Sequence, residues 1–232
     1  MRDLGIKVYL DSANIGEMCD ATEVDGFTTN PTLMRRAGVK DYESWAKSVL
    51  AVVKPRPVSF EVLADDVDEM EHQAHKIAAW GENVYVKIPV MTTKSVRNYA
   101  LIERLSHDGI QVNVTAIAAI GQVAGCSAAL RNGALAIVSV FAGRIADTGR
   151  DACAYMVNAA QILRSQPNIS LLWASTRQVF NVIEAKEAGA HIITVTPDLL
   201  AKLNLLSKDL DDFSRETVQQ FYDDAQAAGY TL

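Results

Sequence analysis

Eight short segments of the chain are rich in β-branched and aliphatic residues, and most of them carry apolar residues on both faces. Such runs are typical of strands in a parallel sheet that is covered on both sides. The intervals between them are long enough to hold a helix each. We therefore expect strands at residues 7–13, 26–30, 58–64, 83–90, 110–116, 136–143, 170–176 and 191–197.

The intervening segments show apolar residues three and four positions apart, which is the period of an amphipathic helix. Gly109 and Gly189 stand where two of these helices would end, because glycine accepts the left-handed backbone of a helix C-terminus. Eight strands alternating with eight helices predict an α/β fold, a single (β/α)8 TIM barrel over residues 1–232. A doubly wound open sheet is the alternative, but no Gly-x-Gly-x-x-Gly follows the first strand.

A further helix is predicted within residues 208–232, after the eighth unit. Its apolar residues have helical spacing, and they are Val218, Phe221, Tyr222 and Ala225. Ser214 is the candidate N-cap. This helix lies either on its own barrel or on a neighbouring subunit, and we expect a homo-oligomer assembled through it.

Composition narrows the range of functions. With 49% hydrophobic and 22% charged residues, the chain has the composition of a soluble globular protein. Its formal net charge of −6 argues against a nucleic-acid partner. No apolar run or N-terminal apolar segment suggests a membrane helix or a signal peptide. The three cysteines lack the spacing of a disulfide or zinc framework, so we expect reduced thiols and a cytoplasmic location.

Lys87 stands in the middle of the apolar segment NVYVKIPV, residues 83–90. An ammonium group is costly to bury, and apolar neighbours such as Val86 and Ile88 favour the neutral amine. A neutral amine attacks a carbonyl, and the resulting protonated imine draws electrons from the adjacent carbon–carbon bond. The alternative is a structural ion pair of Lys87 with Glu61 or Asp11 inside the barrel.

Polar residues recur at the predicted carboxyl ends of the strands, where barrel enzymes place their chemistry. Their convergence favours Schiff-base chemistry over a purely structural ion pair for Lys87. Arg144 and Arg177 fit as a pair that grips a phosphate. The polar set comprises Asp11, Thr29, Asn30, Glu61, Lys87, Asn113, Thr115, Ser139, Arg144, Ser175 and Arg177.

Other polar and aromatic residues have simpler interpretations. His72 and His75 are three positions apart, but without a third ligand we expect a solvated helix face and no metal site. Tyr85 and Trp173 fall within predicted strands and are expected in the core.

Five motifs, in order along the chain, resemble those of the transaldolase family. They are VDGFTTNPTLMRRAG, VYVKIPV, VNVTAIAAIGQV, VSVFAGRIAD and ASTRQ, and the match runs from Asp11 to about Pro197. The chain resembles the short transaldolases, which are class I Schiff-base enzymes related to the fructose-6-phosphate aldolases. The resemblance implies no cofactor, sugar phosphates as substrates, and a place in the pentose phosphate pathway.

The resemblance also implies a role for each matching residue. Lys87 would form the imine, and Asp11 would exchange the proton of the C4 hydroxyl. Glu61 and Thr115 would hold a water that relays protons. Thr29 falls in the same motif as Asn30 and is expected at the substrate. Dihydroxyacetone hydroxyls would bind Asn30, Asn113 and Ser139, and the terminal phosphate would bind Arg144, Ser175 and Arg177.

Glu61 and Phe141 are the two positions that help to distinguish transfer of dihydroxyacetone from simple aldol cleavage. Fructose-6-phosphate aldolases carry Gln and Tyr at these positions, so the resemblance favours a transaldolase that moves dihydroxyacetone between sugar phosphates. Retro-aldol cleavage that releases dihydroxyacetone remains the alternative. Departures at Thr32, Thr176 and the segment MTTKS keep a modified, for example sulfonated, sugar open. A non-catalytic sugar-phosphate-binding barrel is a third possibility.

Overall fold

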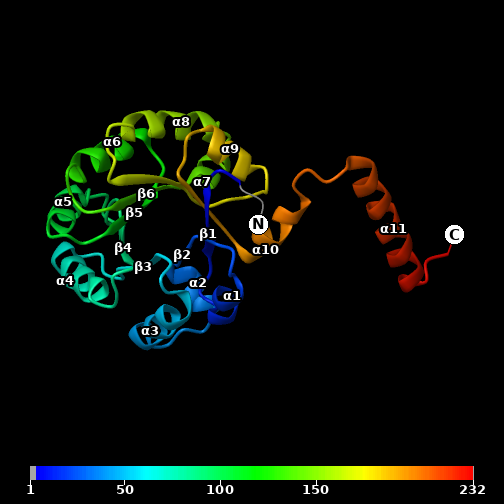
Figure 1. Cartoon of the computed structure of the whole chain (residues 1–232), viewed down its shortest axis with the longest axis horizontal. Helices are drawn as coiled ribbons and strands as arrows, with labels where there is room; N and C mark the ends of the chain where they lie inside the picture. The colour runs from blue at the N-terminus through cyan, green and yellow to red at the C-terminus, as the bar shows by residue number, and fades with distance from the viewer. Residues whose placement is uncertain (1–3, 232) are drawn as a thin grey trace. The chain divides into compact units, whose positions relative to one another are not determined.

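The strands of the protein form one closed barrel. The computed structural model describes residues 4–231, in which eight parallel strands pair in sequential order and β1 also pairs with β8 (Figure 1). The predicted fold class is therefore confirmed. The strands are β1 (Lys7–Asp11), β2 (Gly26–Thr28), β3 (Val58–Glu61), β4 (Val84–Pro89), β5 (Val112–Ile117), β6 (Ala136–Val140), β7 (Ile169–Trp173) and β8 (Ile192–Val195).

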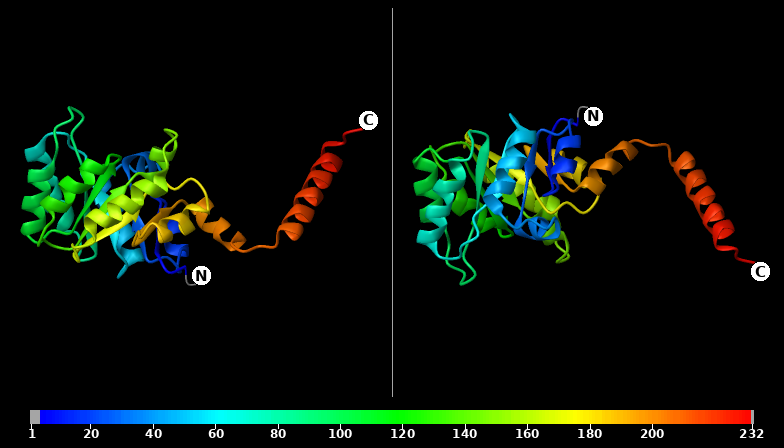
Figure 2. Two further views of the ribbon diagram at one scale, coloured as in Figure 1. Left: turned by 90° about the horizontal axis from the view of Figure 1, so that it is seen from above. Right: turned by 90° about the horizontal axis from the view of Figure 1, so that it is seen from below.

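Helices connect successive strands and lie outside them (Figure 1), and Figure 2 shows the same elements from above and from below. Gly109 and Gly189 follow α5 and α9 with φ values of 85° and 81°, which confirms them as helix ends. The connecting helices are α1 (Ile15–Asp20), α2 (Pro31–Arg36), α3 (Tyr42–Val53), α4 (Val67–Ala78), α5 (Tyr99–His107), α6 (Ile120–Ala129), α7 (Ala142–Ala146), α8 (Ala152–Leu163) and α9 (Asn181–Glu187).

Two of these helices, α2 and α7, are additional to the expected set. Each has six residues or fewer and begins directly after the carboxyl end of a strand. Asn30 caps α2 by accepting from Leu33 N at 3.0 Å, and Pro31 occupies its first turn. Both helices therefore lie on the face of the barrel where the strands end, beside the predicted site.

The barrel interior has an apolar layer and a polar layer. Tyr9, Ile137, Leu172 and Ile192 form a buried cluster on which Tyr85 packs. Side chains two positions apart on a strand face the same way. Two positions further on, four of these strands carry the polar residues Asp11, Lys87, Ser139 and Thr194, whereas β7 continues into the apolar Ala174, which belongs to the cluster. The apolar layer thus closes the barrel beneath the polar groups, and Tyr85 and Trp173 belong to the core as expected.

The contacts of the described chain define two compact units, one up to Leu200 and one from Ala201 onward. The second contains the end of α10 (Pro197–Lys202), a 3-10 turn (Leu203–Leu205) and α11 (Leu210–Ala228). The prediction of Ser214 as N-cap is wrong. Asp209 is the cap, because its side chain accepts from the backbone N–H groups of Asp211 and Asp212.

Candidate active site

A cavity of about 520 Å³ opens at the carboxyl ends of the strands. All of the predicted site residues except Thr29 and Asn113 line it, and it also includes residues that the sequence did not single out. The predicted residues that line it are Asp11, Asn30, Glu61, Lys87, Thr115, Ser139, Phe141, Arg144, Ser175 and Arg177.

Lys87 lies in the wall of this cavity and is only 5% exposed. Its Nζ donates to the carbonyl oxygen of Thr29 at 2.7 Å and lies 3.4 Å from Glu61 Oε2. The register of β3 and β4 pairs Glu61 with Lys87, so the two side chains emerge side by side. The lysine is buried beside a carboxylate but still faces the space in which a ligand would sit.

Asp11 ends β1 on the same layer. Its Oδ1 accepts from Thr28 Oγ1 at 2.7 Å, and its Oδ2 lies 3.4 Å from Asn30 Nδ2. Burial raises the pKa of the Asp11 carboxyl, while Lys87 and the two hydrogen bonds offset part of that rise. The carboxyl group is thus held closer to the range in which it can exchange a proton.

Thr29 and Asn113 support the site from behind. The Thr29 hydroxyl donates to the Ser59 carbonyl at 2.8 Å, which turns this side chain away from the cavity. Asn113 donates to Ser59 Oγ at 2.9 Å and accepts from Ser139 Oγ at 2.7 Å. The side chain of Ser139 is therefore oriented by Asn113, and the binding roles of Thr29 and Asn113 stay predictions.

Thr115 and Ala116 lie where β5 departs from regular pairing with β6. Ala116 has a φ of 61°, a left-handed conformation that is costly for a residue with a side chain. The buried Thr115 Oγ1 has no hydrogen-bond partner among the described residues. Its hydroxyl is therefore available to a group that enters the cavity.

Tyr42 on α3 fixes the strand that carries Glu61. Its hydroxyl donates to the Glu61 carbonyl at 2.9 Å, and its ring packs in an aromatic cluster with Trp45, Phe60 and Trp80. Burial raises the pKa of the Tyr42 phenol, so this donor stays protonated across the physiological range. The Glu61 backbone is thereby held rigidly behind its carboxylate.

The cationic end of the cavity is formed by α7 and the segment after β7. The Arg144 guanidinium lies over the Phe141 ring, 5.1 Å from its centre, and Arg177 pairs with Asp147. Ser175, with a φ of 63°, turns the chain between them. Arg144, Ser175 and Arg177 line the same cavity, which is the arrangement that an anion site requires.

Sequence reasoning missed Arg36, Thr28 and Thr194, which also line the cavity. Thr32, Leu33 and Arg36 share one face of α2, because residues three and four apart lie together on a helix. Arg35 points elsewhere and is not part of the lining. Arg36 lies in the motif VDGFTTNPTLMRRAG, but nothing in the sequence pattern indicates the short helix that orients it.

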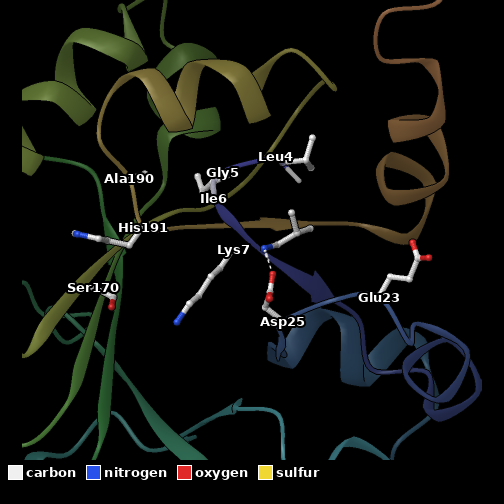
Figure 3. A pocket seen from close by; sticks show the side chains of 10 residues that line it. Leu4, Gly5, Ile6, Lys7, Glu23, Asp25, Ser170, Ala190 and His191 are labelled. Atoms are coloured by element: carbon white, nitrogen blue, oxygen red, sulfur yellow. Dashed lines mark hydrogen bonds between the residues drawn. The ribbon is translucent and has the colours of Figure 1, made fainter. Parts of the chain in front are cut away.

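A second cavity, of about 620 Å³, lies at the opposite face, around the start of β1 (Figure 3). Lys7, Asp25 and His191 line it. Asp25 Oδ2 accepts from Val8 N at 2.8 Å, and His191 Nδ1 accepts from Leu171 N at 2.9 Å. The side chains of Asp25 and His191 thus hold strand ends together, as is typical of this face of a barrel.

Two further features of residues 4–231 concern metals and membranes. No cluster of three or more His, Cys, Asp or Glu side chains there has the arrangement of a metal site, and His72 and His75 belong to none. In the same part of the chain, no helix combines the length and the apolar character needed to span a membrane.

The geometry defines a (β/α)8 barrel with a buried lysine, two carboxyl groups and a cationic rim at its carboxyl-end face. The family model described as Transaldolase/Fructose-6-phosphate aldolase matches residues 8–232. The chain belongs to this family, as the sequence motifs had suggested. It is a transaldolase-type aldolase.

Several curated relatives are similar over most of their length. A probable transaldolase 2 of Listeria monocytogenes is 35% identical over 218 residues, covering 91% of this chain and 95% of that protein. A probable transaldolase of Streptococcus pyogenes is 36% identical over 202 residues, covering 85% and 90%. One of Dehalococcoides mccartyi is 33% identical over 207 residues, with the same coverage.

Solved structures show the likeness of the fold alone. The chain resembles 3-hexulose-6-phosphate synthase from Salmonella typhimurium with a TM-score of 0.58 at 15% identity, covering 82% of this chain and 89% of that one. It resembles KGPDC from Streptococcus mutans with a TM-score of 0.54 at 11% identity, covering 82% and 86%.

Proposed function

We propose that the protein is a transaldolase that moves a dihydroxyacetone unit from a ketose phosphate to an aldose phosphate through an imine on Lys87. The observation that carries this proposal is the position of Lys87 Nζ, buried in the cavity wall and 3.4 Å from Glu61 Oε2. An amine that only stabilised the fold would not need to face a ligand-sized cavity.

The proposed reaction begins when the neutral amine attacks the ketone and water leaves. Glu61 takes the proton that makes the amine neutral and later returns it to the hydroxyl that leaves as water. Thr115, whose hydroxyl is unpartnered among residues 4–231, holds this departing water. Asp11 then accepts the C4 hydroxyl proton while the C3–C4 electron pair moves into the imine. Asn30 and Ser139 bind the dihydroxyacetone hydroxyls, and Asn113 supports this binding by orienting Ser139.

The terminal phosphate binds at the cationic end, on Arg144, Ser175 and Arg177. Guanidinium groups match phosphate oxygens in pairs, which suits this role. A sulfonate also places a negative charge and three acceptor oxygens at the end of the sugar, so a sulfonated sugar remains the alternative substrate at these residues.

Retro-aldol cleavage with release of dihydroxyacetone is the second candidate reaction. Phe141 lines the cavity and has no hydrogen-bonding group to position a water for hydrolysis of the enamine intermediate. This favours transfer to an acceptor sugar. A non-catalytic sugar-phosphate-binding barrel is disfavoured, because binding alone does not use an amine between two carboxyl groups.

Trapping with borohydride tests the imine directly. Incubation with fructose 6-phosphate and borohydride should add the mass of the reduced donor unit to the peptide that contains Lys87. Lys87→Ala should show no adduct, and Lys76→Ala, which alters an exposed lysine on α4, should still show it. An unmodified Lys87 peptide in folded protein would overturn the proposal.

A panel of donors and acceptors tests the substrates. Transfer to glyceraldehyde 3-phosphate or erythrose 4-phosphate, faster than release of free dihydroxyacetone, is the expected result, together with unchanged turnover in a chelator. Such substrates belong to the pentose phosphate pathway in the cytoplasm, which is where we place the enzyme. Preference for a sulfonated donor would redefine the terminal anion.

We also propose that α11 assembles the protein into a homo-oligomer by packing on a second copy of the chain. The helix buries none of its described residues, and its exposed apolar side chains include Phe213, Val218, Phe221 and Tyr222. The family match extends through this helix. Deletion of residues 208–232 should lower the mass measured by light scattering, and an unchanged mass would contradict the proposal.

A further inference from the structure

A chain of three side chains leads from β8 to the carboxyl group of Asp11. Thr194 Oγ1 lies 2.6 Å from Thr28 Oγ1, which in turn donates to Asp11 Oδ1 at 2.7 Å. Thr28 is paired beside Asp11 in the β1–β2 register, and Thr194 faces the barrel from the other neighbour of β1. The sequence offered no sign of this arrangement, because threonine is a common strand residue.

The direction of the hydrogen bonds in this chain follows from the number of protons. A hydroxyl has one proton to donate. Thr28 gives its proton to Asp11, so it can only accept from Thr194, and Thr194 must be the donor of that pair. Among residues 4–231, Thr194 Oγ1 has no second hydrogen-bond partner. If both hydrogen bonds reversed their direction, the Thr194 hydroxyl proton would have no protein acceptor.

The two oxygens of Asp11 are therefore not equivalent. A proton on Oδ1 would reverse both hydrogen bonds and leave the Thr194 proton without a protein acceptor, whereas Oδ2 has, within residues 4–231, one hydrogen-bond contact, the long 3.4 Å one with Asn30 Nδ2. We propose that Thr194 is a positioning residue that acts through Thr28 to keep Oδ1 as a hydrogen-bond acceptor and reserve Oδ2 for proton transfer. This inference rests on the proposed function, in which Oδ2 accepts the C4 hydroxyl proton as the C3–C4 electron pair enters the imine.

The two hydrogen bonds that link Thr194, Thr28 and Asp11 also stabilise the ionised form of the Asp11 carboxyl group. This is the form needed for a general base. The other charged groups that share the cavity are Glu61 on β3, Lys87 on β4, and the arginines Arg36, Arg144 and Arg177 on the rim. Substitutions of Thr194 leave all of these in place. Their effect on Asp11 is therefore attributable to the hydroxyl chain.

The experiment measures the titration of Asp11 by carbon-13 NMR in protein labelled at aspartate carboxyl carbons, with Asp11→Asn to assign the signal. Thr194→Val should raise the midpoint by about 0.5 to 1 pH unit, the scale of one net hydrogen bond. Thr194→Ser should restore it. The acidic limb of the transfer rate should move in the same direction and by a similar amount.

A double-mutant cycle separates this role from a general packing effect. Thr28→Val should shift the midpoint more than Thr194→Val, and the double variant should match Thr28→Val alone, because Thr194 acts only through Thr28. Additive shifts, or an unshifted midpoint in folded Thr194→Val, would overturn the inference. NMR titration needs no substrate, so it gives a result even if the protein shows no transaldolase activity.

Discussion

Gly143 on α7 lies against the backbone of Ser175, so closely that an added Cβ would stand 1.6 Å from the Ser175 carbonyl oxygen. Since that neighbour is backbone, it has no flexible end that can move aside. The contact joins the segment with Arg144 to the segment with Arg177. The absence of a side chain at position 143 thus allows the two arginine-bearing segments to approach each other at the proposed anion site.

Gly143→Ala should therefore separate these segments. We expect a loss of about 1–3 kcal/mol of stability from overpacking, seen as a lower Tm, and a higher KM for phosphorylated substrates. Gly121→Ala on α6 is the matched control, because an added Cβ there has nothing within 4 Å. An unchanged Tm and KM in Gly143→Ala would show that the loops accommodate a side chain.

Arg36 is predicted to contribute to the binding of the anionic substrate. It lines the cavity without a hydrogen-bond or ion-pair partner among the described residues, whereas Arg177 is paired with Asp147. Arg36→Gln should raise KM for phosphorylated substrates about tenfold, the equivalent of about 1.4 kcal/mol. The rate with unphosphorylated fructose should be unaffected.

Arg35→Gln provides the control for this prediction. Arg35 is the adjacent exposed arginine, has the same charge, and does not line the cavity. Its replacement should leave KM unchanged. Equal effects of the two substitutions would mean that only the general positive charge of α2 matters.

The strands and the lysine could be predicted from sequence because both have local signals. A covered parallel strand is apolar throughout, so a charged residue such as Lys87 stands out within it. Its neighbours Glu61 and Asn113 follow from strand order, since sequential parallel strands place corresponding carboxyl ends together.

The remaining parts of the site depend on tertiary contacts without a local signal. The left-handed backbone of Ala116 and Ser175 occurs at residue types that do not favour it. The pairing of Thr28 with Thr194 joins residues 166 positions apart. The N-cap of α11 was misassigned because Ser214 and Asp209 are both good capping residues, and only the helix start distinguishes them.

Phe141→Tyr should shift the reaction from transfer toward release. A phenol at this cavity position can donate a hydrogen bond to a water that hydrolyses the enamine intermediate, which a phenyl ring cannot do. Free dihydroxyacetone release, relative to transfer, should rise about tenfold, the scale of one well-placed hydrogen bond. The measurement is a dihydroxyacetone assay with and without acceptor.

The control for this change is Phe180→Tyr, which adds the same hydroxyl at an exposed phenylalanine that does not line the cavity. Its ratio of release to transfer should equal that of the unaltered protein. If Phe141→Tyr keeps the original ratio while it remains folded, Phe141 does not govern the fate of the enamine.

Asp11→Asn should make the protein more stable at neutral pH although it abolishes proton transfer. Burial raises the pKa of Asp11 in the folded state, so the folded protein binds this proton more tightly than the unfolded chain. Stability is then lost as pH rises from the ordinary aspartate pKa through the raised one. The Tm gain of Asp11→Asn should be absent near pH 4 and reach a plateau at higher pH, with about 2–4 °C for each kcal/mol.

Asp65→Asn is the control and should lower the Tm at neutral pH, because hydrogen bonds from Thr93 lower the pKa of Asp65. A Tm difference for Asp11→Asn that does not vary with pH would show that the Asp11 charge has no net cost in the folded state.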